Sequence, residues 1–298
     1  MQPAERGCET FMSELQDFSE RTVYTQPIML SAFLLVSLLL FVMGAAVGSF
    51  LNVVIYRTVR GEGWVAGRSH CEHCRTKIAW YDMVPVFSYA LLGGKCRSCK
   101  HPIPILHPVV EIMSGMLFVW WYWGGSLFFQ LTQTPLSTLQ PLFWLMVGIL
   151  LLAVFVADTL YMIIPDLAVE MLFGLTILYR IYLLVEGELQ MTDFLLAIAS
   201  MVVLTLAFFL LWYGTKRRGL GFGDVKFAAP MALLLGWPKV LVGVLVAFVV
   251  GASVGIVLLI SRKRTLTQAV PFGPFLVLGT VFALLFGDSV WQWYSAFL

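Results

Sequence analysis

The chain is organised around one stretch, Gly219-Leu-Gly-Phe-Gly-Asp-Val-Lys226, which lies between two long apolar runs. A second acidic stretch, Asp158-Thr-Leu-Tyr-Met-Ile-Ile-Pro-Asp166, follows an earlier apolar run. An ionisable residue at membrane depth is energetically costly and is therefore a functional candidate. Asp158 and Asp224, at matching ends of two runs, indicate a pair that works together. The alternative is two interfacial residues that cap helices in water.

The composition excludes a soluble protein. Of 298 residues, 60% are hydrophobic and only 12% are charged. A soluble domain of this size needs a polar exterior and could not place so much apolar surface inside. The sequence therefore predicts an all-α, polytopic membrane protein.

Eight apolar runs predict about eight transmembrane helices. They cover residues 28–56, 109–131, 142–157, 167–185, 194–213, 227–237, 240–260 and 272–293. In the first run, Gly44 and Gly48 form a Gly-x-x-x-Gly face on which another helix can pack closely. Asn52, deep in the same run, needs a hydrogen-bond partner.

The basic residues predict the orientation in the membrane. Three connections, 57–108, 214–226 and 261–271, hold 15 of the 19 basic residues and fall on one side if eight helices alternate. The positive-inside rule assigns that side to the cytoplasm. These residues are Arg57, Arg60, Arg68, Arg75, Lys77, Lys95, Arg97 and Lys100, then Lys216, Arg217, Arg218 and Lys226, then Arg262, Lys263 and Arg264.

Two Cys-x-x-Cys pairs lie in the one sizeable polar segment, 57–108. The first is Cys71 with Cys74 and the second is Cys96 with Cys99. Four thiolates in two such turns are typical of a tetrahedral zinc site, and four protein ligands make the zinc structural. The alternatives are disulfides, which a cytoplasmic location disfavours, and metal-free thiols.

The segment from Asp224 to Trp237 is too short to cross a membrane. Its 14 residues make roughly 21 Å of helix, against about 30 Å of hydrocarbon. We therefore expect Asp224 to lie in a wet notch below the membrane boundary, facing Asp158. Two carboxylates that share one proton can act as base and acid, activating water against a peptide carbonyl.

At this point the chain resembles the type IV prepilin peptidases, membrane aspartyl proteases of the Gly-x-Gly-Asp kind. The resemblance extends from about residue 40 to 285 and rests on the order of several motifs. The motifs are Gly48-Ser-Phe-Leu-Asn-Val-Val-Ile-Tyr-Arg57, both Cys pairs, Tyr81-Asp-Met-Val-Pro-Val-Phe-Ser-Tyr89, Gly94-Lys-Cys96, Pro108-Val-Val-Glu111, Asp158 to Asp166, Gly221-Phe-Gly-Asp-Val-Lys226 and Pro271-Phe-Gly-Pro274.

The resemblance implies cleavage of the basic leader of a prepilin or pseudopilin, after its last Gly, at the cytoplasmic face of a bacterial inner membrane. Asp158 and Asp224 carry over as the catalytic pair. Asp166 follows the pattern, but a helix cap after Pro165 explains it better. Many members also N-methylate the new terminus with S-adenosylmethionine; Glu111 is then either a cofactor contact or a plain interfacial residue.

We expect four parts: a polar N-terminal tail (1–27), a first transmembrane helix (28–57), a cytoplasmic zinc-binding domain (58–108) and a transmembrane protease core (109–298). The expected partners are prepilin substrates and membrane lipids, with no nucleic acid. Two alternatives stay open: a proton- or ion-coupled transporter, which also uses paired intramembrane carboxylates, and a non-catalytic scaffold that docks partners on the zinc hairpin.

Overall fold

The computed structural model describes residues 4–63, 67–128, 139–216, 219–261 and 270–297, with side chains from residue 30 onward except those of 125–128 and 139. This part of the chain is nearly all helical, as predicted. Its elements are α1 (Ala4–Val59), η1 (Trp80–Met83), α2 (Phe87–Leu91), α3 (Leu106–Phe128), α4 (Leu139–Tyr161), α5 (Asp166–Val185), α6 (Met191–Gly214), α7 (Phe222–Leu235), α8 (Lys239–Ile260) and α9 (Gly273–Ser295).

The described part of each of the eight expected apolar runs lies wholly or mostly in a helix. Within the described residues, six helices are long and apolar enough to cross a membrane. They are 30–59, 140–161, 166–185, 191–214, 239–260 and 273–295. The two apolar helices outside this set are α3, with 23 residues, and α7, with only 14.

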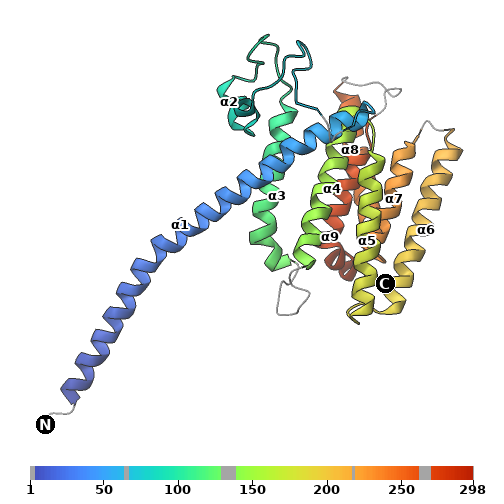
Figure 1. The fold of residues 1–298 in the computed structure, drawn as a ribbon. Helices are drawn as coiled ribbons and strands as arrows, with labels where there is room; N and C mark the ends of the chain where they lie inside the picture. Colours follow the sequence, from blue (N-terminus) through green and yellow to red (C-terminus); the bar gives the residue numbers. More distant parts are fainter. Residues whose placement is uncertain (1–3, 64–66, 129–138, 217–218, 262–269, 298) are drawn as a thin grey trace.

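The helices form a bundle with one long arm. Figure 1 shows α4 to α9 side by side, while α1 runs obliquely away from them and packs along α3. The residues assigned to the polar tail continue the same helix, α1, as the first span. The small segment between α1 and α3, which contains η1 and α2, sits at the end of the bundle where α1 ends and α3 begins.

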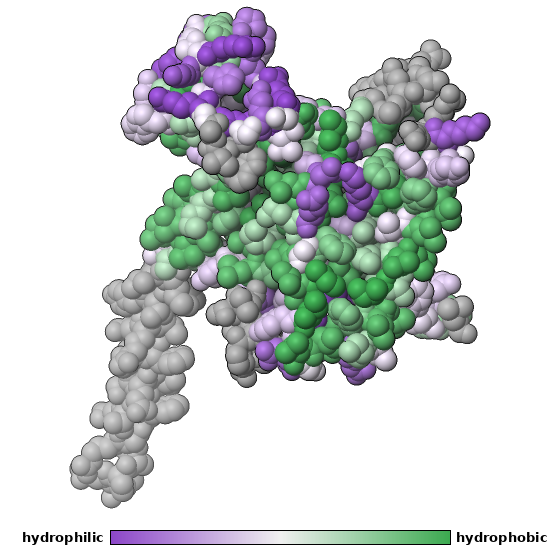
Figure 2. Space-filling model, turned by 45° about the vertical axis from the view of Figure 1, so that its right-hand side comes forward, coloured by the Kyte–Doolittle hydropathy of each residue, from purple (hydrophilic) through white to green (hydrophobic). Residues whose placement is uncertain are grey.

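Apolar side chains cover the outside of the bundle. In Figure 2 hydrophobic residues dominate this face of the helices, whereas hydrophilic ones gather on the small segment beside them. On α6, Val203 is 66% exposed and Leu210 is 57% exposed. Lipid is the solvent that accepts such a surface, because water would make large contiguous apolar patches unfavourable.

The predicted Gly-x-x-x-Gly face packs against α3. A Cβ atom on Gly44 would lie 2.5 Å from the Ser114 carbonyl oxygen, and one on Gly48 would lie 2.8 Å from the Glu111 Cα. Only glycine therefore allows the two backbones to approach this closely. Asn52 has the partner it needs, since its Nδ2 donates to the His107 carbonyl oxygen at 3.1 Å.

The short helix α7 is the buried centre of the bundle. Ten of its 14 residues are buried, and it contacts α5, α6, α8 and α9. At its C-terminal end the Arg180 guanidinium, from α5, donates to the Leu233 carbonyl oxygen and, at 3.3 Å, to that of Leu234. A cation there satisfies carbonyls that have no partner inside the helix.

Candidate active site

Asp158 and Asp224 line one pocket. The pocket has a volume of about 490 Å³ and lies between the end of α4, the start of α7 and the last residues of α1, Thr58 and Val59. Each aspartate is only 5% exposed. The two carboxylates lie near enough to repel one another electrostatically. Two buried acids that share a cavity are a suitable arrangement for acid–base chemistry.

Each carboxylate is held by the backbone of a glycine. The Gly273 N–H donates to Asp158 Oδ2 at 2.8 Å, and the Gly221 N–H donates to Asp224 Oδ2 at 3.0 Å. Both glycines lie where a helix begins, so the donors belong to backbone that has no helical partner for them. In each acid one oxygen is fixed, and the other is left for a shared proton or a water molecule.

Sequence reasoning missed the role of Gly273. A Cβ atom at this position would lie 2.6 Å from Asp158 Oδ2, so the close approach requires glycine. The available signal was the motif Pro271-Phe-Gly-Pro274, a glycine between bulky residues at the start of an apolar run. Its contact with Asp158, 115 positions earlier, depends on the packing of α9 against α4 and has no local signature.

An ion pair lies at the mouth of the pocket. Lys226 Nζ lies 2.7 Å from Asp166 Oδ1, and both side chains are partly exposed. Helix α5 does begin at Asp166, but its N-cap residue is Pro165, and the Asp166 carboxylate pairs with Lys226. An exposed pair of this kind adds little stability; its effect is to join the first turns of α5 and α7 beside the two buried acids.

The four cysteines form one cluster made of two similar turns. All four sulfur atoms lie within 4.8 Å of one another, with Cys71 Sγ 3.8 Å from Cys99 Sγ. In the first turn the Cys71 N–H donates to the Thr76 carbonyl, and in the second the Cys96 N–H donates to that of His101. The turns therefore place their thiols in equivalent positions around one point.

Comparisons with family profiles and with individual proteins point to the same family. The profile described as "Bacterial Peptidase A24 N-terminal domain" matches residues 42–124, and "Type IV leader peptidase family" matches residues 144–256. Three relatives carry the name "Prepilin leader peptidase/N-methyltransferase". They come from Aeromonas hydrophila (30% identical; 86% of this chain, 92% of the relative), Pseudomonas aeruginosa (30%; 89% and 94%) and Stutzerimonas stutzeri (31%; 86% and 92%).

The chain belongs to the type IV leader peptidase family. It is thus an enzyme of the aspartic peptidase class, as the sequence predicted. No solved structure matches the chain. The match to the type IV leader peptidase profile includes Asp158 and Asp224 and ends before Gly273.

In this leader peptidase the cysteine cluster fits zinc. A tetrahedral ion with Zn–S bonds of about 2.3 Å separates its sulfur ligands by about 3.8 Å, and that is the distance between Cys71 Sγ and Cys99 Sγ. Hydrogen bonds with the side chain and backbone of Thr76 lower the pKa of Cys74 to about 6. Cys74 therefore forms a thiolate readily near neutral pH, whereas desolvation and the three other thiols raise the pKa of Cys99 to about 11.

Glu111, the residue considered for cofactor contact, is engaged inside the protein. It is 9% exposed, and its Oε2 accepts the Val86 N–H at 2.7 Å. Val86 has φ of 60°, a conformation that a β-branched residue rarely adopts and that surrounding contacts must hold. Glu111 therefore ties α3 to the small segment through its Oε2.

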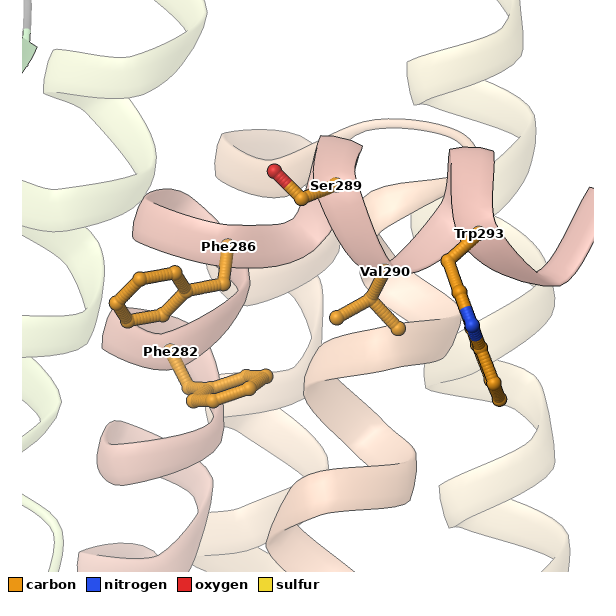
Figure 3. Close-up of a pocket in the computed structure, with 5 residues that line it drawn as sticks. All are labelled: Phe282, Phe286, Ser289, Val290 and Trp293. Carbon is orange, nitrogen blue, oxygen red and sulfur yellow. The ribbon is translucent and has the colours of Figure 1, made fainter.

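A second cavity, of about 350 Å³, lies in the second half of α9 and offers no acid–base chemistry. Figure 3 shows the aromatic rings of Phe282, Phe286 and Trp293, with Val290 and Ser289, all on one helix. Ser289 is the single polar side chain that lines it. The pocket that contains both aspartates is therefore the candidate active site of this leader peptidase.

Proposed function

We propose that Asp158 and Asp224 are the catalytic pair, and that the chain cleaves the leader of type IV prepilins or pseudopilins at the cytoplasmic face of the inner membrane. The observation that carries the proposal is the placement of two buried carboxylates in one pocket, each with one oxygen fixed by a glycine N–H. The names of the relatives support the substrate class.

The mechanism follows from one proton shared by two acids. The ionised carboxylate takes a proton from a water molecule, whose oxygen then attacks the carbonyl carbon of the peptide bond. The protonated carboxyl group gives its proton to the carbonyl oxygen as the tetrahedral intermediate forms. Collapse of the intermediate breaks the C–N bond: the carboxyl group that took the proton of water gives it to the leaving nitrogen, and the other carboxylate takes back the hydroxyl proton as the carbonyl re-forms. Asp158 and Asp224 exchange roles between the two steps, which restores the starting state.

Mass spectrometry of a pilin-like substrate tests the activity directly. Purified full-length protein is incubated with the substrate, with and without S-adenosylmethionine, and the products are weighed. We expect one cut, after the glycine that ends the basic leader. A substrate that stays intact in lipid and in detergent, with folded enzyme, would contradict the proposal.

N-methylation of the new terminus is part of the relatives' names, and we extend the proposal to it. The cofactor would be S-adenosylmethionine. Glu111 does not fit as its direct contact, because the carboxylate already accepts the Val86 N–H and is buried. No methylation step is therefore assigned to a residue. A mass increase of one methyl group on the product, only with S-adenosylmethionine present, is the expected result.

Zinc bound by Cys71, Cys74, Cys96 and Cys99 is proposed to be structural, because four protein ligands leave no open position for substrate. We expect about one zinc per chain in protein purified without chelators. Cys71→Ser and Cys96→Ser should lose the metal and make residues 57–108 more sensitive to protease. Cys8→Ser, which changes the fifth cysteine, is the matched control.

Cleavage should fall only in part in the two zinc-site variants. The cysteines lie outside the pocket. The first turn is nevertheless close to it, since Glu72 lies within electrostatic reach of Tyr161, three residues after Asp158. Metal analysis that finds no zinc in the wild-type protein would refute the zinc site.

Topology can be tested by the accessibility of single cysteines introduced into each connection. We expect 57–108, 214–226 and 261–271 to react from the cytoplasmic side and 186–193 to react from the opposite side. The reason is the distribution of the basic residues. Most of 261–271 lies outside the described residues, so labelling tests it independently of the structure. Labelling of 186–193 from the cytoplasm would contradict the orientation.

A further inference from the structure

Helix α4 ends four residues before α5 begins, and the connection lies against the catalytic pocket. Met162 has φ of 54°, so the chain turns sharply as it leaves α4. Pro165 has the extended values of φ −65° and ψ 124°. Residues 162–165 all line the pocket that contains both aspartates. We refer to this connection, Met162 to Pro165, as the 162–165 segment.

Some backbone N–H and C=O groups of the 162–165 segment have no hydrogen-bond partner among the described residues. The Met162 N–H donates to the Asp158 carbonyl oxygen, which ends the hydrogen bonding of α4. Within the described residues, the N–H and C=O groups of Ile163 and Ile164 have no protein partner. Backbone groups in a folded protein are nearly always paired with protein or water, so these four groups are open to a ligand.

Packing fixes the segment while leaving one side of it accessible. The Ile164 side chain is 7% exposed and lies against Gly223, where a Cβ atom would come within 3.1 Å of it. Met162 and Ile163 are 49% and 47% exposed. The segment is thus anchored through Ile164 to the start of α7, next to Asp224, and presents two apolar side chains beside the pocket.

We propose that the 162–165 segment is the edge on which substrate binds: the peptide on one side of the cleaved bond lies extended along it and pairs with the backbone N–H and C=O of either Ile163 or Ile164, since these groups of neighbouring residues face opposite sides of an extended chain. Addition of an extended peptide to free backbone groups is a common mode of recognition, in which main-chain hydrogen bonds give affinity. The exposed side chains of Met162 and Ile163 contact an apolar residue of the substrate. The inference rests on the proposed function and adds the substrate-binding edge to it.

The geometry explains why pairing here would serve catalysis. The segment begins four residues after Asp158, and its anchor touches the first turn of the helix that carries Asp224. A peptide held along it runs past both carboxylates, which positions its carbonyl carbon for attack by water. Main-chain pairing also tolerates different side chains in the substrate.

The test measures binding separately from cleavage. Full-length Asp224→Asn protein in detergent is titrated with a fluorescent peptide that spans the proposed cleavage site. In a series of analogues, one backbone amide at a time is replaced by an ester, which removes one N–H. We expect the ester to weaken binding about tenfold at one position of the peptide, or at two positions spaced two residues apart. At the other positions it should change the affinity little.

Two variants test the neighbouring hydrogen bond of the same pairing, in which an enzyme N–H donates to a carbonyl oxygen of the substrate. Ile164→Pro removes one of the backbone donors, and Ile164→Val keeps it with a similar side chain. If the pairing is through Ile164, the peptide should bind to Ile164→Pro about tenfold more weakly, and the ester that weakens wild-type binding should add less to the loss. If thermal unfolding shows that the variant is not folded, the ester series on the Asp224→Asn protein still tests whether the substrate pairs with the backbone of the segment.

The outcomes separate this inference from the proposed function. The proposed pairing is overturned if the peptide does not bind, or if no ester changes its affinity by more than about twofold. If the affinity then depends only on substitutions at Ile163, the substrate contacts side chains and not the backbone. A wild-type protein that leaves the unmodified peptide uncut contradicts the proposed function, whereas a positional ester pattern in that same case still supports the binding edge.

Discussion

Asp158→Asn and Asp224→Asn should each lower the rate of peptide cleavage by roughly 10³-fold or more. An amide cannot take a proton from water, and one carboxylate alone cannot be both base and acid. The double variant should be no worse than either single one, because residues that act as a unit are not additive. Asp→Glu keeps the charge but moves it, so a trace of activity is expected. The measurement is the initial rate of product formation by mass spectrometry.

The pH dependence gives a second readout of the same pair. Because the mechanism needs one proton on two acids, the rate should fall at low pH, where the base is protonated, and at high pH, where the acid is ionised. Asp288→Asn is a matched control: Asp288 pairs with Lys239, and neither residue lines the pocket. Full cleavage by either Asp158→Asn or Asp224→Asn would refute the catalytic assignment.

Gly273→Ala should lower cleavage by roughly 10²-fold while leaving the protein folded. The new Cβ would lie 2.6 Å from Asp158 Oδ2, so either the carboxylate or the start of α9 has to move. Misplacement of a catalytic group by about 1 Å is enough for a loss of this size. The rate is compared with that of the wild type at equal amounts of folded protein, judged by thermal unfolding.

Gly255→Ala is the control for that experiment. Gly255 lies inside α8, and a Cβ atom there would meet no heavy atom within 4 Å. The substitution should leave activity unchanged and help α8 slightly, since alanine favours helix over glycine. Equal losses in both variants would mean that Gly273 matters only as a helix residue, and that its contact with Asp158 has no role in the reaction.

The fold class and the cysteine cluster were predictable because their signals are local. Apolar runs indicate helices, and the spacing of the Cys-x-x-Cys pairs indicates a metal site without knowledge of the fold. The grouping of Gly44 and Gly48 on one face likewise predicted close helix packing, and the structure confirms it against α3. In each case the residues that interact or repeat lie close together in the sequence.

What could not be predicted depends on contacts between distant segments. Hydropathy marks α7 as apolar but does not say that it is enclosed by other helices. The hydrogen bond from Gly273 to Asp158 and the burial of Glu111 against Val86 arise from packing between elements. The roles of Asp158 and Asp224 remain a prediction, which the variants above test.

The length of helix α7 also sets the depth of Asp224 in the bundle. Arg180 fixes its far end and the pocket holds its near end, so the depth of Asp224 is set by the number of residues between them. Each residue adds about 1.5 Å and turns the helix by about 100°. One inserted residue would therefore both lift the carboxylate and rotate it away from Asp158. On the proposed mechanism, the 14 residues of this helix would therefore set the depth at which the peptide bond of the substrate meets Asp224.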